Sequence, residues 1–382
     1  MDIPFIFGKI ATGGNFTDRE EETARLVNNF SYCVNTILIS PRRWGKSSLV
    51  HKAARISTDE NPDLKVCHID LLNILTVDDF YTQYANAVIK ATSSKWEEFI
   101  ANAKEFFTSL TPRISLNPVP GVEVSLSFDH EQLHLNRDEI LDLPEKIAQK
   151  KGFKIAVCMD EFQKIGEWHN SDYLQGKFRS KWQHHQRVGY CLFGSKRHMM
   201  LEIFTNASKP FYRFGDLMFL NKIPRNDMQH FIEQRFRETD KKIMEEAAAL
   251  IIELVNDHPY YCQQLAQLSW LRTSSICDTD TVRTAHRSLV EQLSLLFTNL
   301  TEELSVQQLN YMKAVINGET AISSTETMKR YGISSATSAS RSKTALIKKD
   351  ILDNLEGRPQ FLDPVYQYWL KHYFFNTPSY GD

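Results

Sequence analysis

The stretch from Ser40 to Ser48 has the residue types and the spacing of a loop that binds phosphate. In such a loop the backbone N–H groups turn toward the phosphates, Lys46 adds a positive charge, and the Ser47 hydroxyl is a ligand for Mg²⁺. Gly45 stands where a Cβ atom would crowd the phosphate. We therefore expect a nucleotide to be bound by the residues of this loop, Ser40, Pro41, Arg42, Arg43, Trp44, Gly45, Lys46, Ser47 and Ser48.

Ser40 departs from the Walker A pattern G-x-x-x-x-G-K-[ST], which has glycine at this position. A serine can take the place of that glycine if its backbone stays at negative φ. We therefore interpret the loop as a weakened match that still binds nucleotide.

A second candidate group follows the apolar run 155–159, where Asp160 and Glu161 stand at the predicted end of a strand. An acidic pair after a strand is also common in solvated turns. Downstream of a phosphate loop, in a chain of alternating strands and helices, it is typical of a Walker B motif. We expect Asp160 to hold Mg²⁺ through its water shell and Glu161 to polarise the attacking water.

A further predicted strand, residues 189–193, ends at Gly194-Ser195. Ser195 is a candidate to bind the γ-phosphate or the attacking water, although Gly194-Ser195 could equally form a turn and cap the next helix. The two roles do not exclude each other. Arg213 and Arg197 are candidates for a phosphate-sensing arginine, a role that an arginine of a neighbouring protomer could also fill; a surface ion pair is the commoner fate of such a residue.

The elements that would position these side chains form an α/β pattern. Apolar runs at 36–39, 64–71, 155–159 and 189–193 alternate with helical segments, which predicts a parallel sheet. Alternating segments near 113–128, split by a turn at 118–121, predict a β-hairpin insertion, and a helix is expected to follow over 138–151. Phe16 to Glu20 opens a helix, with Thr17 as its expected N-cap; this segment, including Phe16 and Arg19, is either a capped surface helix or a contact to the nucleotide base.

We predict three domains: an ATPase core at 1–222, a helical lid at 223–298 and a winged helix-turn-helix at 299–382. The helix expected at 335–348 carries Arg341 and Lys343 among small polar residues, which suits a DNA groove. Acidic residues balance the basic ones in this segment, and winged helices also bind proteins. DNA and a protein partner therefore both stay open.

Composition excludes several classes of protein. With 382 residues, 42% hydrophobic and 24% charged, the chain is that of a globular protein of two or three domains. A net charge of −2 argues against a general polyanion binder. Six cysteines without a C-x-x-C pair predict free thiols and a cytoplasmic protein. No apolar run reaches the ~18 residues of a membrane span.

Together these motifs resemble a family of P-loop ATPases abundant in archaea, of the STAND branch of AAA+-like NTPases and similar to the origin-recognition ATPases. The resemblance rests on Pro-Arg-Arg before Gly-Lys-Ser, on Asp-Glu-Phe-Gln at 160–163, on Gly194-Ser195 and on Asp363-Pro364. It implies that Lys46, Asp160, Glu161 and Ser195 serve catalysis and that the segment from Phe16 to Glu20 corresponds to a box beside the adenine. It also implies that His258-Pro259 belongs to a lid motif, in which Asp257 stands where a glycine is common.

From these features we predict a Mg²⁺-dependent ATPase that acts as a slowly hydrolysing switch and couples its nucleotide state to the winged helix. One alternative is a DNA-binding regulator or initiator-like protein whose nucleotide sets assembly into a homo-oligomer. Another is a signalling scaffold whose winged helix binds protein.

Overall fold

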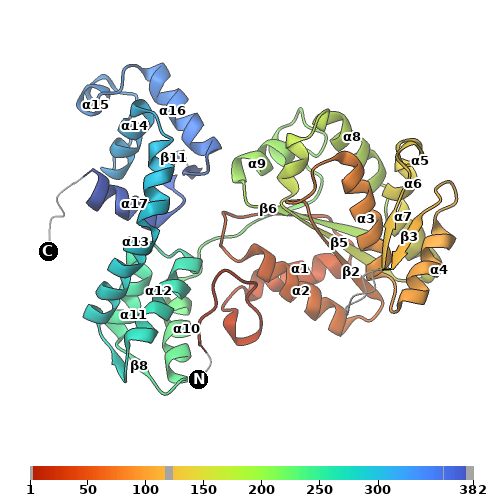
Figure 1. The fold of residues 1–382 in the computed structure, drawn as a ribbon, viewed down its shortest axis with the longest axis horizontal. Helices are drawn as coiled ribbons and strands as arrows, with labels where there is room; N and C mark the ends of the chain where they lie inside the picture. Colours follow the sequence, from red (N-terminus) through yellow and green to blue (C-terminus); the bar gives the residue numbers. More distant parts are fainter. Residues whose placement is uncertain (1–2, 117–123, 356, 376–382) are drawn as a thin grey trace. The chain divides into compact units, whose positions relative to one another are not determined.

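The structure is a computed structural model, and it describes residues 3–116, 124–355 and 357–375 (Figure 1). The chain forms two compact units. One is the continuous stretch Arg19–Asn221, and the other combines Met1–Asp18 with Lys222–Asp382. The second unit thus includes the first 18 residues, which the predicted core domain 1–222 had assigned to the core.

A five-stranded parallel sheet forms the centre of the unit Arg19–Asn221, in the order β2-β5-β6-β1-β7. Because all strands run in the same direction, their carboxyl ends meet at one edge of the sheet. Register places Asp70 beside Asp160 and Ile39 beside Gly194. The strands are β1 (Thr36–Ile39), β2 (Leu64–Asp70), β5 (Lys154–Asp160), β6 (Val188–Gly194) and β7 (Asp216–Phe219).

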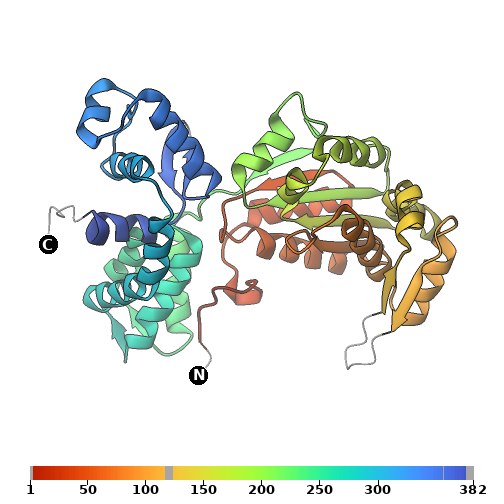
Figure 2. The same cartoon turned by 45° about the horizontal axis from the view of Figure 1, so that its top comes forward.

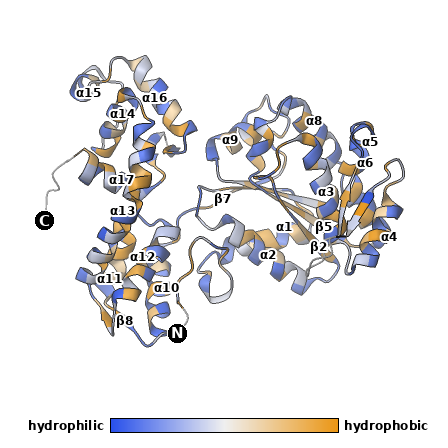
Figure 3. Cartoon of the chain, viewed as in Figure 1, coloured by the Kyte–Doolittle hydropathy of each residue, from blue (hydrophilic) through white to orange (hydrophobic). Residues whose placement is uncertain are grey.

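Helices cover both faces of this sheet, and its central strands β5, β6 and β1 are accordingly apolar almost throughout; β6 is buried along its whole length. In Figures 1 and 2, α1 (Glu20–Ser31) and α2 (Lys46–Glu60) lie on one face and α3 (Val77–Ala91), α8 (Ser171–Trp182) and α9 (Arg197–Thr205) on the other. Hydrophobic and hydrophilic residues alternate along these helices, as expected of helices with one buried side (Figure 3).

The predicted hairpin insertion is present as the antiparallel pair β3 (Arg113–Leu116) and β4 (Val124–Ser127). Its predicted turn at 118–121 lies outside the described residues. The helix expected over 138–151 is divided into α6 (Arg137–Leu141) and α7 (Leu143–Lys151). Pro144 in the first turn of α7 explains the division, because proline has no N–H to continue the preceding helix. The remaining elements of this unit are α4 (Trp96–Phe106), α5 (His130–Leu135) and the 3₁₀ segment η2 (Phe162–Glu167).

The other unit is mostly helical and begins with the N-terminal segment. Phe5 is buried and its ring packs edge-on against Phe231 and Phe236, while the Ile6 N–H donates to Gln263 Oε1 at 3.1 Å. The expected cap at Thr17 is not formed: α1 begins at Glu20, and Arg19 precedes it with φ 76° and no side-chain capping bond. Left-handed residues at Asp18 and Arg19 turn the chain sharply there, so Thr17 is too far from the first turn to cap it.

The helices predicted as a lid are followed by a winged helix-turn-helix. The lid helices are α10 (Arg225–Arg237), α11 (Glu245–Leu254), α12 (Pro259–Arg272) and α13 (Thr279–Glu302), accompanied by the short strands β8 (Lys242–Ile243) and β9 (Ile276–Cys277). The winged helix-turn-helix comprises α14 (Val306–Ile316), α15 (Thr325–Tyr331), α16 (Ala336–Lys348), β10 (Leu352–Leu355), β11 (Arg358–Phe361) and α17 (Pro364–Trp369). Among the described residues, no helix combines the length and the apolar character needed to cross a membrane.

Candidate nucleotide site

The loop between β1 and α2 has the backbone that a phosphate-binding loop requires. Gly45 has φ 89° and directly precedes Lys46, the first residue of α2. Arg43 also has positive φ, at 64°, whereas Ser40 does not. Ser40 is fully buried and its hydroxyl donates to the Pro41 carbonyl oxygen at 2.9 Å. Serine at this position thus keeps the negative φ that it needs to replace glycine.

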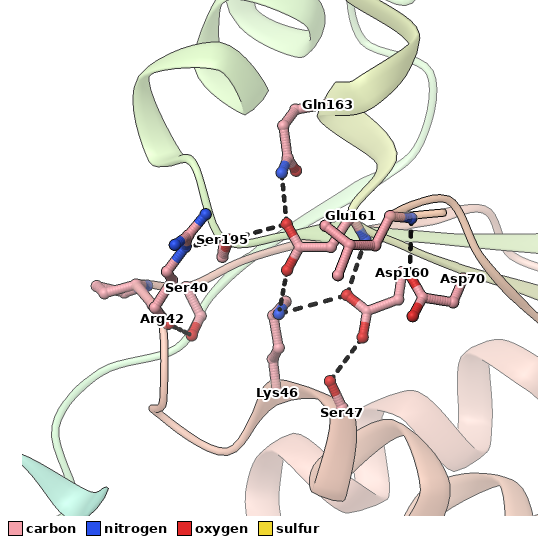
Figure 4. Close-up of polar contacts among 11 residues, drawn as sticks. Ser40, Arg42, Lys46, Ser47, Asp70, Asp160, Glu161, Gln163 and Ser195 are labelled. Carbon is pink, nitrogen blue, oxygen red and sulfur yellow. Dashed lines mark hydrogen bonds and ion pairs between the residues drawn. The ribbon is translucent and has the colours of Figure 1, made fainter. Parts of the chain in front are cut away.

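The first two residues of α2 face the acidic pair at the end of β5 (Figure 4). Lys46 Nζ lies 2.9 Å from Glu161 Oε1 and 3.3 Å from Asp160 Oδ1. The Ser47 hydroxyl donates to Asp160 Oδ2 at 2.6 Å. Residues that are more than a hundred positions apart therefore meet in one polar cluster, with a cation and a hydroxyl on one side and two carboxylates on the other.

Glu161 is held at both of its carboxylate oxygens. Oε1 faces Lys46, and Oε2 accepts hydrogen bonds from Ser195 Oγ at 2.8 Å and from Gln163 Nε2. Burial alone would raise the pKa of Glu161, but the charge of Lys46 and these three donors outweigh it and hold the pKa below its ordinary value. Glu161 is therefore ionised at neutral pH, as a group that takes a proton from water must be.

Strand order explains why Ser195 joins this cluster. β6 lies between β1 and β5, so the residue that follows β6 stands between the phosphate loop and the acidic pair. Besides its bond to Glu161, the Ser195 hydroxyl accepts from Arg42 Nε at 3.4 Å. Ser195 thus contacts one residue from each of the two motifs.

The cluster also fits a magnesium ion. Mg²⁺ takes oxygen ligands, keeps several waters, and needs only one or two protein groups besides the phosphates of a substrate. Ser47 Oγ and Asp160 Oδ2 are two converging oxygens of this kind. Within the described ranges no group of three or more His, Cys, Asp or Glu side chains could hold a metal by itself.

The two arginine candidates differ in where they lie relative to this cluster. The Arg213 guanidinium lies over the Tyr212 ring, 5.2 Å from its centroid, and its backbone has φ 54°. The Arg197 guanidinium lies 5.5 Å from the centroid of Phe219, which pairs with Ile39 at the end of β1. Arg197 is therefore at the same edge of the sheet as the phosphate loop, whereas the contact of Arg213 does not place it there.

The candidates for contact with the nucleotide base are engaged in other contacts. Arg19 is only 4% exposed, and its two terminal nitrogens bind Glu22 Oε1 at 3.0 Å and the Asn221 carbonyl oxygen at 2.5 Å. These contacts join the start of α1 to the point where the chain leaves this unit. Phe16 is half-buried and belongs to the other unit. A role for Phe16 and Arg19 beside the base stays a prediction.

Two residues of this region were not among the sequence-based candidates. Gln163 binds Glu161 as described above, although it had been noted only as part of a motif. Asp70 ends β2 in register with Asp160, and its Oδ1 accepts from the Leu72 N–H at 2.9 Å. Asp70 could have been predicted from the sequence, because it is an acidic residue near the end of the run 64–71 and that run ends at the same edge of the sheet as the phosphate loop.

Two further motifs lie in the other unit. Asp257 has φ 57°, the left-handed backbone for which glycine is favoured, and its carboxylate pairs with Arg225 Nε at 2.5 Å. On α16, Arg341 is exposed and Lys343 is half-buried. The helix α16 itself contains no acidic residue.

Comparisons with known proteins establish the fold. The family model described as "Probable winged helix domain" matches residues 295–372. A Walker-type ATPase of Pyrococcus abyssi is similar over 96% of this chain and 99% of its own, with 18% identity and a TM-score of 0.67. The ORC2 protein of Aeropyrum pernix, in ADPNP–ADP complexes, is similar over 95% of this chain and 94% of its own, with 13% identity and a TM-score of 0.55.

No curated protein matches the chain. At these identities the likeness concerns the fold and not the activity. The predicted fold class is confirmed: the chain has the fold of P-loop ATPases similar to the origin-recognition ATPases, with a parallel-sheet core and a C-terminal winged helix.

Proposed function

We propose that the protein binds ATP with Mg²⁺, hydrolyses it slowly, and couples its nucleotide state to the C-terminal winged helix. The observation that carries this proposal is the convergence of Lys46 and Ser47 on Asp160 and Glu161. The ORC2 protein of similar fold, solved in ADPNP–ADP complexes, supports the choice of an adenine nucleotide.

The residues of the phosphate loop and of the acidic pair have distinct roles in this reaction. Lys46, freed from the carboxylates, binds the phosphates, while Ser47 and Asp160 would hold Mg²⁺, which would neutralise phosphate charge. Glu161 orients a water whose oxygen bonds to the γ-phosphorus as the bond to the β,γ-bridging oxygen breaks. ADP leaves with that oxygen, one water proton stays on the phosphate, and the other passes through Glu161 to solvent.

Two substitutions test the site. Lys46→Ala should abolish measurable binding of a fluorescent ATP analogue, because it removes the charge at the phosphates. Glu161→Gln should retain binding but slow hydrolysis by ~10²-fold or more, because the amide is a poor base for water. Lys104→Ala, at an exposed lysine on α4, is the matched control and should behave as the unaltered protein. Unchanged affinity in Lys46→Ala would show that the nucleotide binds elsewhere.

A DNA-binding role is a second candidate, favoured by the charge of α16. This helix carries Arg341, Lys343 and Lys348 and no acidic residue, so the balance of charges in the surrounding segment does not hold on the helix itself. The exposed residues Thr337 and Ser340 leave room for close approach to a groove. In the alternative hypothesis, the winged helix binds a protein partner instead of DNA.

The DNA role is tested by fluorescence anisotropy with a labelled duplex over a series of salt concentrations. Binding should weaken steeply with salt, and replacing Arg341 and Lys343 together by alanine should reduce both the affinity and the slope. Lys242→Ala, at an exposed lysine of β8, is the control. If the protein binds no DNA at low salt but captures a partner protein in a nucleotide-dependent way, the protein-binding alternative is favoured. Particle mass in ADP and in an ATP analogue tests the predicted homo-oligomer.

A further inference from the structure

Gln163 is buried directly against the carboxylate of Glu161. Glu161 has φ 53°, and this left-handed residue turns the chain into the 3₁₀ segment η2, so that the side chain two positions later comes back to it. Gln163 is 1% exposed, and its Nε2 donates to Glu161 Oε2 (Figure 4). Because Gln163 is enclosed, its amide cannot itself serve as a ligand for a substrate in the solvent-accessible part of the site.

Gly194 provides the space in which the Gln163 amide lies. A Cβ atom on Gly194 would stand 1.9 Å from Gln163 Oε1, far inside any van der Waals contact. Gln163 Oε1 is buried and has no hydrogen-bond partner among the described residues, so no polar contact fixes that end of the amide. The orientation of Gln163 therefore depends on the absence of a side chain at residue 194, the last residue of β6.

We propose that Gln163, seated against Gly194, is a positioning residue that aims Glu161 at the attacking water; this inference rests on the proposed ATP hydrolysis. Oε2 of Glu161 is held by Gln163 and Ser195, and Oε1 is held by Lys46. When Lys46 turns to the phosphates, Oε1 becomes available to water while Oε2 stays fixed. Gln163 thus determines which oxygen acts and where it points.

Both donors to Oε2 are needed for this geometry. Ser195 also accepts from Arg42 of the phosphate loop, so its hydroxyl is shared with the segment that would contact the phosphates. Gln163 makes its bond from the interior of the unit and stays in place. Orientation of a general base contributes strongly to rate, so loss of the Gln163 bond should slow hydrolysis without changing how tightly nucleotide binds.

The first test replaces the amide by a side chain of similar size without a donor. Gln163→Met should lower the single-turnover rate of ATP hydrolysis about tenfold or more, with the Kd for ADP and for an ATP analogue unchanged within about twofold. A change that only loosened the fold would weaken binding and hydrolysis together. Circular dichroism and thermal melting confirm that the variant is folded.

The second test displaces the Gln163 amide by a substitution at Gly194. Gly194→Ala should slow hydrolysis like Gln163→Met, because its methyl group displaces the amide. In a Gln163→Ala background the same substitution should have little further effect, since there is no amide left to displace. The added methyl would also approach Met200 Sδ at 2.9 Å, but that flexible side chain can yield. Gly166→Ala is the matched control in η2, because its Cβ would meet only ordinary contacts at 3.8 Å.

The outcomes separate this inference from the proposed function. If the unaltered protein hydrolyses ATP but Gln163→Met does so at the same rate, the positioning role is wrong and the ATPase proposal stands. Equal losses from Gly194→Ala in both backgrounds, or a parallel loss of nucleotide affinity, would likewise overturn it. A protein that binds no nucleotide, or that binds it without hydrolysis, would overturn the proposed function and this inference with it.

Discussion

Ser40 holds the position at which the Walker A pattern has glycine, and its surroundings explain why it is tolerated. Its backbone has no need of positive φ, its side chain is enclosed, and its hydroxyl bonds to the next carbonyl. We predict that Ser40→Gly lowers the free energy of unfolding by ~1 kcal/mol, because glycine adds freedom to the unfolded chain and the hydrogen bond is lost. Urea denaturation measures this change.

The same substitution should leave nucleotide affinity within about twofold of the unaltered protein, because the loop already has its required backbone at Gly45. Titration with a fluorescent ADP analogue checks this expectation. A marked gain in affinity or hydrolysis in Ser40→Gly would mean that the serine does hold the loop away from its best geometry.

At the residue scale, strand ends were predictable and side-chain directions were not. Lys46, Ser47, Asp160 and Ser195 could be expected to meet because parallel strands bring their carboxyl ends to one edge. Gln163 could not, because its direction depends on the left-handed turn at Glu161, which no periodicity in the sequence encodes.

At the scale of elements, Asp363 joins two helices of one unit. Its Oδ1 accepts from the N–H groups of Val365 and Tyr366 at the start of α17, and its Oδ2 accepts from the Tyr261 hydroxyl of α12 at 2.6 Å. Asp363→Ala should therefore lower the free energy of unfolding by roughly 2 kcal/mol, since it removes an N-cap and a charge-assisted bond. Chemical denaturation followed by circular dichroism provides the measurement.

Tyr261→Phe is the matched comparison, because it removes only the hydroxyl and keeps the cap of α17. Its loss should be about half that of Asp363→Ala or less. An equal loss from the two variants would mean that the cap contributes nothing and that the bond between the helices is the whole effect.

The presence and order of the helices could be predicted from hydrophobic periodicity, whereas the residues at which they begin and end could not. The start of α1 was misplaced because Asp18 and Arg19 adopt left-handed backbone, which is unusual for residues other than glycine. Pro144 indicated in the sequence that the helix expected over 138–151 is divided before α7. The periodic apolar pattern on both sides of Pro144 nevertheless favoured a single helix.

At the scale of the whole molecule, stability should depend on a buried histidine in the unit that contains the winged helix. His286 of α13 is 2% exposed and packs edge-on against Tyr368, 4.6 Å between ring centroids. Burial, together with the nearby His372, lowers the pKa of His286 to about 4. In the unfolded chain its pKa is near the ordinary ~6.5, so the unfolded state binds the proton first as pH falls.

His286 therefore favours folding above pH ~6.5, and this contribution is lost as pH falls toward 4, by up to about 2 kcal/mol at pH 5. His286→Leu should flatten the pH dependence of urea unfolding between pH 7 and 5. His230→Leu, at an exposed histidine of α10, should leave it unchanged. An unaltered slope in His286→Leu would show that other groups set the acid sensitivity.

The division into two units was the least predictable property. The N-terminal segment joins the unit of α10 and α12 through Phe5, a contact between residues more than two hundred positions apart that no local pattern reveals. The chain consequently passes between the units twice, after Asp18 and after Asn221, and Arg19 binds the Asn221 carbonyl oxygen beside these two points.

Two units with separate cores should unfold in two thermal transitions, and nucleotide should distinguish them. ADP should raise only the transition of Arg19–Asn221, which contains the phosphate loop, because a ligand stabilises the unit that binds it. If the γ-phosphate couples that unit to the winged helix, a non-hydrolysable ATP analogue should also raise the second transition. Lys46→Ala should remove both effects. Scans that are the same in ADP and in the analogue would show that the protein binds nucleotide without acting as a switch.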